Sequence, residues 1–353
     1  MAAALEQCAG EGSPISVATK DEAKSADFTR EQPLSTQSKA THGIAEAWAP
    51  HRARYLDFQP VFWESRSAGG LHEYASIADN FVQSLRSSGV CADQDKLPRF
   101  YRNEVLSVVW SANVLELGTL GPNPASTQRM LREMLTSPAA GKSVASSASS
   151  ESGEWLASGR GNSAEQWCWL ARQSLRAWMI LQDAAKENTA LSVNLIVRVH
   201  RTLMKGAKAD DGRHSVGMVA AGELRTEGVR AGDYVFPRAD LVPCRLEKLI
   251  NEFEARLEAG HAVEAAALLL LDFVSLHPFM DGNGRTCRFL FAYALMRAGF
   301  PFPVVFSSGH SKAREHYLRA LVAAQQRRHY WGIYAMAWAS VMRSIRNYQV
   351  FSL

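Results

Sequence analysis

One stretch of the chain, bounded by an apolar segment on each side, constrains the fold more than any other feature. It runs from His277 to Arg288 and has the sequence HPFMDGNGRTCR. Before it lies Ala262 to Leu276 (AVEAAALLLLDFVSL), and Arg285 to Arg297 (RTCRFLFAYALMR) is again strongly apolar, so two buried helices are predicted. Pro278 cannot donate a backbone hydrogen bond, so the first helix should end near His277. A tight polar loop must therefore join two buried helices.

The composition of this loop suits an anion. Gly282 and Gly284 allow consecutive backbone N–H groups to turn inward as a nest, and Asn283 can cap the following helix. A helix N-terminus offers unpaired N–H donors and partial positive charge, which favour a phosphate. Arg285 and Arg288 are three residues apart on the same helix, so both guanidinium groups can reach one oligophosphate.

The same stretch carries groups suited to phosphoryl chemistry. Asp281 offers the hard oxygen ligand that Mg²⁺ prefers. His277 is the one residue of the stretch that can act as a neutral base near pH 7. Alone, each residue is more often structural, but together they favour attack of a hydroxyl group, deprotonated by His277, on a nucleotide phosphorus.

These residues match the pattern HPFx[D/E]GNGRxxR, and the stretch thereby resembles the Fic family with its Doc relatives. Two upstream segments are also similar to family elements. Ile196 to Gly206 resembles the upstream helix, and Gly222 to Thr226 (GELRT) resembles a G-x-[FL]-R-T segment that leads into a hairpin flap. The resemblance covers about Gln166 to Arg328 and implies a mainly α fold, a Fic-type helical bundle with a short β-hairpin flap.

The resemblance also implies an activity: transfer of AMP from ATP to a Ser, Thr or Tyr hydroxyl of a target protein, with release of pyrophosphate. ATP would be the substrate and Mg²⁺ the cofactor. His277 would be the base, Asp281 the Mg²⁺ ligand, and Phe279 a packing residue that anchors the loop. The residues implied to hold the phosphates are Gly282, Asn283, Gly284, Arg285 and Arg288.

The implied partner is a target protein docked on the flap, at about Thr226 to Pro237 (TEGVRAGDYVFP). Gly228, Gly232 and the β-favouring Tyr234 to Phe236 suit a hairpin there. Family flaps hold the target by strand-type main-chain pairing. The sequence leaves a homodimer open.

A second resemblance concerns control. Ser111 to Leu120 (SANVLELGTL) is similar to an inhibitory helix of many family members, [S/T]xxxE[G/N], whose Glu pairs with the last Arg of the main motif. Glu116 takes the position of that Glu, while Ala112 and Leu117 depart from the pattern. Our hypothesis is that Glu116 pairs with Arg288 and inhibits transfer; the alternative is an ordinary solvated helix Glu.

Recognition of the nucleotide base is less defined. Tyr317 matches a Tyr that flanks the purine in close relatives, but Ala324 to Arg327 (AQQR) stands where they carry Asn-x-Gly-Asp. Three alternatives therefore remain: another phosphate donor, removal of AMP by hydrolysis, or a non-catalytic nucleotide-binding interaction module. The intact His277, Asp281 and Arg288 favour an enzyme.

Composition excludes other classes. The chain has 353 residues, of which 47% are apolar, enough to bury a sizeable core. Its net charge of +4, from 39 basic and 35 acidic residues, argues against nucleic acid as a partner. The five cysteines are scattered, which suits a reducing compartment. No apolar run approaches the roughly eighteen residues of a membrane span, and because the first residues lack an apolar stretch, no secretory signal is expected. We expect a cytoplasmic or nuclear protein that does not bind membranes.

The predicted organisation has four parts: a disordered tail at 1–41, a helical region at 42–163, the Fic domain at 164–328 and a C-terminal helix at 329–353. The second part contains the candidate inhibitory helix and a flexible Ser/Gly-rich insertion, 137–163. Strands are expected only in the flap. Helices are predicted at about His72–Ser87, Leu97–Leu117, Thr127–Leu135, Ala164–Lys186, Val193–Lys205, Leu241–Ala259, Ala262–Leu276, Asn283–Ala298, Lys312–Gln326 and Tyr330–Tyr348.

Overall fold

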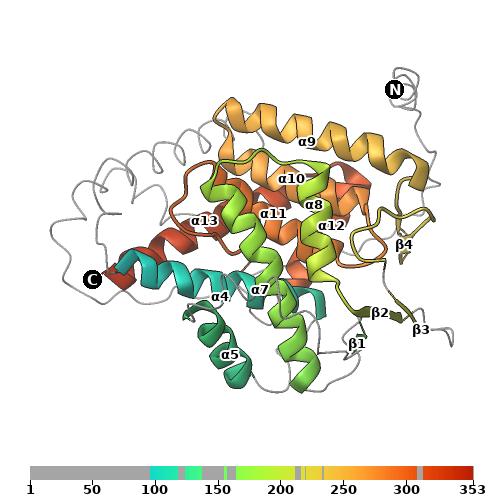
Figure 1. Ribbon diagram of the computed structural model, residues 1–353. Coiled ribbons are helices and arrows are strands. Elements are labelled where there is room, and N and C mark those ends of the chain that lie inside the picture. The colour runs from blue at the N-terminus through green and yellow to red at the C-terminus, as the bar shows by residue number, and fades with distance from the viewer. Residues whose placement is uncertain are drawn as a thin grey trace, which may run out of the picture. The chain divides into compact units, whose positions relative to one another are not determined.

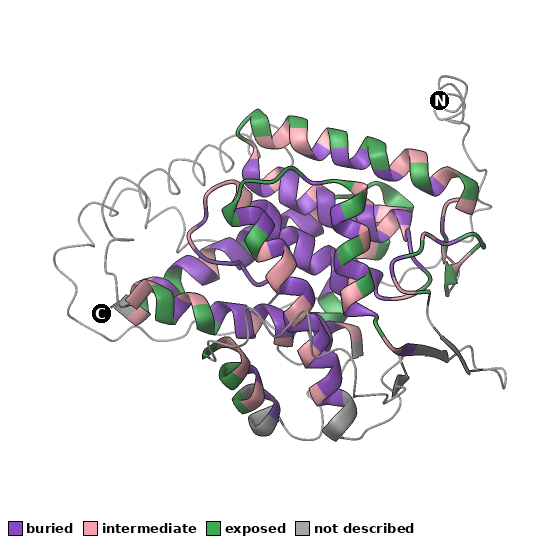
Figure 2. Ribbon diagram, in the orientation of Figure 1, coloured by how far each residue is buried: buried purple, intermediate pink, exposed green. Residues whose placement is uncertain are grey.

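Two apolar helices form the centre of the fold, as the sequence predicts. They are α10 (Ala262–Leu276) and α11 (Asn283–Arg297), and nearly every side chain of α11 is buried. They pack against each other, and both are drawn as buried ribbons in Figure 2. Because α11 has almost no exposed face, other helices must cover it on several sides.

The other helices come from positions both before and after the central pair in the sequence (Figure 1). They are α4 (Lys96–Leu117), α5 (Pro124–Thr136), α7 (Ala164–Lys186), α8 (Val193–Leu203), α9 (Val242–Glu258), α12 (Ala313–Arg327) and α13 (Trp331–Ser352), with a 3₁₀ turn at Ala239–Leu241. Helices α4, α7 and α8 pack against α11, while α9 and α13 pack against α10. Helix α4 therefore reaches the central pair although it lies far away in the sequence.

The computed structural model describes residues 96–117, 124–136, 155–156, 164–210, 216–218, 220–232, 234–307 and 313–352. Nine of the predicted helices fall in this part of the chain, and each is confirmed with ends that differ by a few residues at most. The predicted helix at His72–Ser87 and the tail at 1–41 lie outside the described residues. The described residues belong to one compact unit, Ser67–Leu353, and the proposed internal domain boundaries stay a prediction. Among the described helices, none combines the length and apolar character that crossing a membrane requires.

The loop between the two central helices begins and ends in left-handed backbone. His277 caps the C-terminus of α10 with φ 51°, and Gly282 caps the N-terminus of α11 with φ 76°. The sequence assigned the cap to Asn283, and this is wrong, because Asn283 is the first helical residue. Its side chain instead turns back to Phe279, accepting from the backbone N–H at 3.0 Å and donating to the carbonyl at 2.8 Å. The Asn283 amide therefore closes the loop on itself.

Strands occur in two places. The predicted flap is confirmed as an antiparallel hairpin of β4 (Arg230–Ala231) and β5 (Tyr234–Val235). The expectation of no other strands is wrong: β1 (Trp155–Leu156), β2 (Ala207–Asp210) and β3 (Val216–Met218) form a second small sheet. Strand β1 lies inside the segment predicted as a flexible insertion, and it pairs in parallel with β2. The β2 sequence AKAD lacks apolar alternation, so pairing with its neighbours, and not its own pattern, makes it a strand.

Replacing Phe279 with Ala should lower the free energy of unfolding by about 3–5 kcal/mol, as is typical of a deleted core aromatic ring. The Phe279 ring is fully buried and stacks on the imidazole of His200 with centroids 3.6 Å apart. Chemical denaturation measures the change. Met280→Ala is the matched control, because that neighbouring side chain is 46% exposed and its loss should cost less than about 1 kcal/mol. Equal losses in the two variants would contradict the anchoring role.

Candidate active site

The imidazole of His277 is held in its neutral form. Its Nδ1 lies 3.3 Å from the carbonyl oxygen of Val274, and because a carbonyl can only accept, Nδ1 carries the proton. The lone pair is then on Nε2. Burial lowers the pKa of His277 to about 4, so the ring is neutral at pH 7. The ring also stacks on Phe236 at the end of the hairpin, with centroids 4.0 Å apart.

Two arginines of α11 bring buried positive charge to the same place. Arg285 is fully buried, and its Nε and Nη1 have no hydrogen-bond partner within the described residues. Its Nη2 lies 3.3 Å from the sulfur of Met204. Arg288 is 4% exposed and donates from Nη2 to Glu116 Oε2 at 2.7 Å. Because a buried cation needs an anionic or polar partner, the unsatisfied Arg285 points to a ligand with negative charge.

Glu116 reaches this site from α4. The predicted pairing of Glu116 with Arg288 is confirmed as a contact. A Cβ atom added at Gly284 would collide with Glu116 Oε2. The carboxylate therefore lies directly over residues 282–284, the glycine loop. Burial raises the pKa of the Glu116 carboxyl, but the charges of Arg288 and Arg285 outweigh burial and leave the pKa below its ordinary value. Glu116 is therefore ionised and occupies the region predicted to bind phosphate.

Main-chain contacts dock α4 on the site. Arg288 Nη2 donates to the carbonyl oxygen of Ala112 at 2.9 Å, and Arg314 Nε donates to that of Leu115 at 3.1 Å. Ala112 replaces the hydroxyl residue of the inhibitory pattern, and its carbonyl provides a tether that needs no hydroxyl. The departure at this position therefore does not release the helix.

Asp281 lies at the start of the glycine loop, where its Oδ1 accepts from the N–H of Gly282 at 2.5 Å. Burial raises the pKa of Asp281, the charge of Arg285 opposes this, and the charge of Glu116 adds to it. Among the described residues, no group of three or more His, Cys, Asp and Glu side chains could hold a metal ion. Mg²⁺ commonly takes one or two carboxylates together with substrate phosphate oxygens. Asp281 fits such a shared site, in which the substrate supplies the other ligands.

Tyr317 comes to the site from α12. The ring is buried, and the Arg288 guanidinium carbon lies 5.9 Å from its centroid. The segment 324–327, which departs from the family pattern, lies at the end of the same helix. There Gln325 donates to the hydroxyl of Ser275 at 3.1 Å, so its side chain ties α12 to α10. The structure thus brings together all the predicted site residues from three segments of the chain.

His200 of α8 contacts two segments of the site through its ring. It is fully buried; its Nδ1 accepts from the N–H of Gly222 at 2.9 Å, and Nε2 lies 2.8 Å from the carbonyl oxygen of Asp281. Nε2 therefore carries the proton, and the ring links two segments around the site. The sequence held a signal, because Ile196, Val199 and Leu203 place His200 on the buried face of α8.

Arg225 is a second residue whose role was missed. The sequence placed it in the GELRT segment without a function. It is 3% exposed and donates to the main-chain carbonyls of Leu276 and His277. An Arg ahead of an expected hairpin gave no indication of burial, because arginine side chains are mostly exposed.

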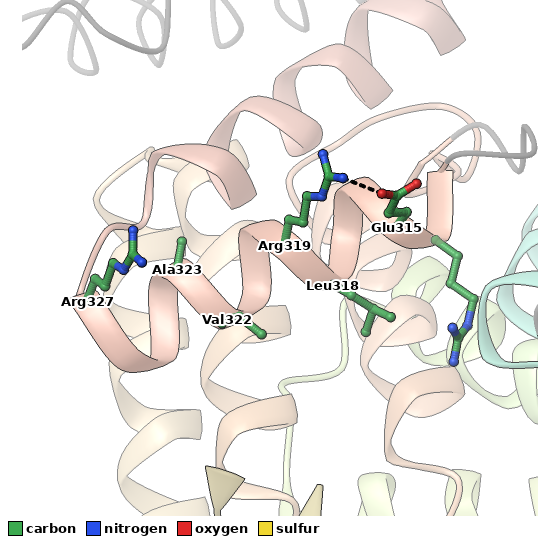
Figure 3. Close-up of a pocket in the computed structure, with 7 residues that line it drawn as sticks. Glu315, Leu318, Arg319, Val322, Ala323 and Arg327 are labelled. Carbon is green, nitrogen blue, oxygen red and sulfur yellow. Dashed lines mark hydrogen bonds and ion pairs between the residues drawn. The ribbon is translucent and has the colours of Figure 1, made fainter. Parts of the chain in front are cut away.

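An open groove of about 610 Å³ lies elsewhere, on the outer face of α12 (Figure 3). Its lining residues are Arg314, Glu315, Leu318, Arg319, Val322, Ala323 and Arg327. No base, metal-ligand or phosphate-binding candidate lines it. Tyr317 is buried on the other side of the helix, so the groove is separate from the candidate active site.

Part of the chain is similar to known proteins. Residues 190–295 match the model of the Fic/DOC family. A protein of Nematostella vectensis called protein adenylyltransferase Fic is 36% identical over 125 residues, which are 34% of this chain and 26% of the relative. A protein of the same name from Aedes aegypti is 33% identical over 138 residues, 38% of this chain and 25% of the relative. The matched segment spans about a quarter of the length of these relatives.

Solved structures show the same fold. A Fic domain containing signaling protein from Bacteroides thetaiotaomicron has a TM-score of 0.56 and 20% identity, covering 77% of this chain and 96% of that chain. Fic-1 (aa134–508) from C. elegans has a TM-score of 0.51 and 23% identity, covering 86% of this chain and 77% of that chain. Residues 190–295 are thus similar to the Fic/DOC family, and the described residues share the fold of solved Fic-domain structures.

The imidazole of His277 should remain unprotonated as the pH falls from about 8 to about 5, whereas an ordinary histidine has a pKa of about 6.5. The physical reason is burial, which lowers the pKa to about 4 and keeps the ring neutral until the solution is distinctly acidic. Titration of the histidine ¹³Cε1 resonances by NMR measures this, with His277→Asn assigning the signal. A midpoint near 6.5 would show that the ring is solvated and not held in the described environment.

Proposed function

We propose that this protein is a nucleotidyltransferase that moves AMP from ATP to a hydroxyl group of a target protein, and that Glu116 inhibits it. One observation carries the proposal. The buried Arg285 has two nitrogens without a partner among the described residues, and the neighbouring Arg288 pairs through Nη2 with a carboxylate from another helix. Such a pair of cations over a glycine loop suits a triphosphate.

The residues define a chemical sequence. The β- and γ-phosphates of ATP would lie at the N-terminus of α11, held by backbone N–H groups of the glycine loop and by Arg285 and Arg288. His277 Nε2 accepts the proton of the target hydroxyl, whose oxygen bonds to the α-phosphorus. The bond from the α-phosphorus to the bridging oxygen breaks, and pyrophosphate leaves. Asp281 would hold Mg²⁺, which neutralises phosphate charge when bound.

The hairpin is the proposed docking element for the target. Its second strand, β5, exposes Val235, which is 73% accessible, while Phe236 packs on the His277 ring. A peptide strand paired with the hairpin would thus lie next to the base. Main-chain pairing of this kind gives affinity without fixing the target sequence.

The proposed inhibition rests on competition between Glu116 and a phosphate of ATP for the positive charge of Arg288. Glu116 is ionised, pairs with Arg288, and lies against Gly284, so its carboxylate takes space and charge that a phosphate would need. A phosphate must displace Glu116 or bind in a poorer position. The wild-type chain should therefore react slowly even with Mg²⁺ and ATP present.

Replacing Glu116 with Gly should increase labelling of a target by [α-³²P]ATP at least about tenfold, which corresponds to about 1.4 kcal/mol of barrier. Incubation of the purified protein with lysate, Mg²⁺ and ATP measures this. Glu116→Gln separates charge from size, since a neutral side chain of the same volume should release only part of the inhibition. Adding His277→Ala should reduce labelling by about 10² to 10⁴-fold. Glu133→Gly, at an exposed position of α5, is the matched control.

The outcomes separate the alternatives. Label from the α-phosphate but not from [γ-³²P]ATP supports AMP transfer, and the reverse supports phosphotransfer. Equal rates for wild type and Glu116→Gly would exclude inhibition by Glu116. Tight ATP binding without label in Glu116→Gly would indicate a nucleotide-binding interaction module and end the transferase proposal.

A further inference from the structure

Arg225 precedes the hairpin in the sequence. Its side chain contacts both the hairpin segment and the loop between α10 and α11. The residue is 3% exposed, and the acceptors of its guanidinium are all main-chain carbonyl oxygens. Burial lowers the pKa of Arg225, although the group stays charged near neutral pH. A buried cation held by backbone alone fixes the position of whatever backbone it contacts.

The contacts divide between two segments. Toward the loop, Arg225 Nε donates to the carbonyl of His277 at 2.7 Å, Nη2 donates to that of Leu276 at 3.3 Å, and its backbone N–H donates to that of Pro278 at 2.9 Å. Toward the hairpin, Nη1 donates to Glu227 at 2.8 Å and Nη2 donates to Pro237 at 2.5 Å. Glu227 and Pro237 lie on either side of the two strands, so one side chain ties both ends of the hairpin to the loop.

The need for arginine follows from the geometry. The last carbonyls of a helix have no partner within the helix, and Leu276 and His277 stand at the end of α10. His277 is also in left-handed backbone, which a non-glycine residue adopts only when its surroundings hold it. Arginine offers five donors in a planar fork, whereas the ammonium of lysine offers three at one point. Lysine therefore cannot reach all four carbonyls.

A second contact links the same two segments. The ring of Phe236 stacks on that of His277, with centroids 4.0 Å apart and 29° between the planes. Phe236 directly precedes Pro237, whose carbonyl Arg225 holds. The main chain of the base and its ring are thus both fixed relative to the hairpin.

We propose that Arg225 is a positioning residue that couples the hairpin to His277, so that docking of a target and orientation of the base are set together. The proposal rests on the proposed function for the role of the hairpin in docking. Arg225 makes no hydrogen bond to Asp281, Arg285 or Arg288 within the described residues. Its loss should therefore affect target modification and leave nucleotide binding intact.

The test uses the full chain carrying Glu116→Gly, with Arg225→Lys, Arg225→Ala or the control Arg238→Lys added. Arg238 is exposed, directly follows the hairpin segment, and pairs with Asp240. Arg225→Lys should reduce kcat for target labelling at least about tenfold while the Kd for Mg²⁺-ATP stays within about twofold, a loss of about 1.4 kcal/mol confined to the transfer step. Arg238→Lys should match the parent in both. Unchanged labelling in Arg225→Lys, or ATP binding weakened in proportion to labelling, overturns the proposal.

Hydrogen–deuterium exchange tests the coupling without relying on activity. In Arg225→Lys, exchange should increase in peptides covering 226–237 and in those covering 276–282, while peptides of α7 and α9 stay as in the parent. Faster exchange in only one of the two segments, or throughout the chain, overturns the coupling. If the Glu116→Gly parent fails to label any target, the proposed function fails, and the exchange result still decides the role of Arg225. If Arg225→Ala does not fold, the lysine variant supplies both measurements.

Discussion

The burial of two guanidinium groups at the N-terminus of α11 is the constraint on which the site depends. Arg285 and Arg288 are almost completely shielded from water, next to a helix end that is itself electropositive. Concentrated positive charge of this kind is costly unless an anion is present. The protein supplies one from α4, Glu116, and this carboxylate adds to the apolar and main-chain contacts that hold α4 against the central helices.

The pKa values of Asp281 and His277 depend on these charges. Burial is the largest influence on the pKa of Asp281 and raises it. Arg285 lowers this pKa, and Glu116 raises it. Glu116 also opposes the fall in the pKa of His277 that burial causes. Departure of Glu116 would remove the repulsion that it exerts on Asp281, which favours the ionised carboxylate. The same departure would lower the pKa of His277 further, so the base would remain neutral. Both changes are in the direction that the proposed release of inhibition would require.

The sequence predicted the elements that follow from local residue patterns, and it missed those that form only by pairing between distant segments. The two helices on either side of the glycine loop followed from apolar runs and from Pro278, and the hairpin followed from glycines around Tyr234 and Val235. The contact of Glu116 with Arg288 came from a family resemblance, since no periodicity joins residues so far apart in sequence. The sheet of β1, β2 and β3 was missed because its short strands carry no alternation and form only by pairing.

Two residues missed as functional from the sequence, His200 and Arg225, share a physical role. Each makes its bonds to main-chain atoms, so neither belongs to a recognisable cluster of side chains, and only the folded chain shows what they hold. His200 accepts from Gly222 and donates to the carbonyl of Asp281, which requires a neutral ring with the proton on Nε2. Burial lowers the pKa of His200 to about 4, which keeps that tautomer in place near neutral pH. The segment before the hairpin is thus fixed to both ends of the loop between α10 and α11. Arg225 binds the carbonyl of His277, and His200 links Gly222 to Asp281. If His277 and Asp281 act as proposed, these contacts hold both residues in place before any nucleotide binds, which would reduce the reorganisation that the reaction requires.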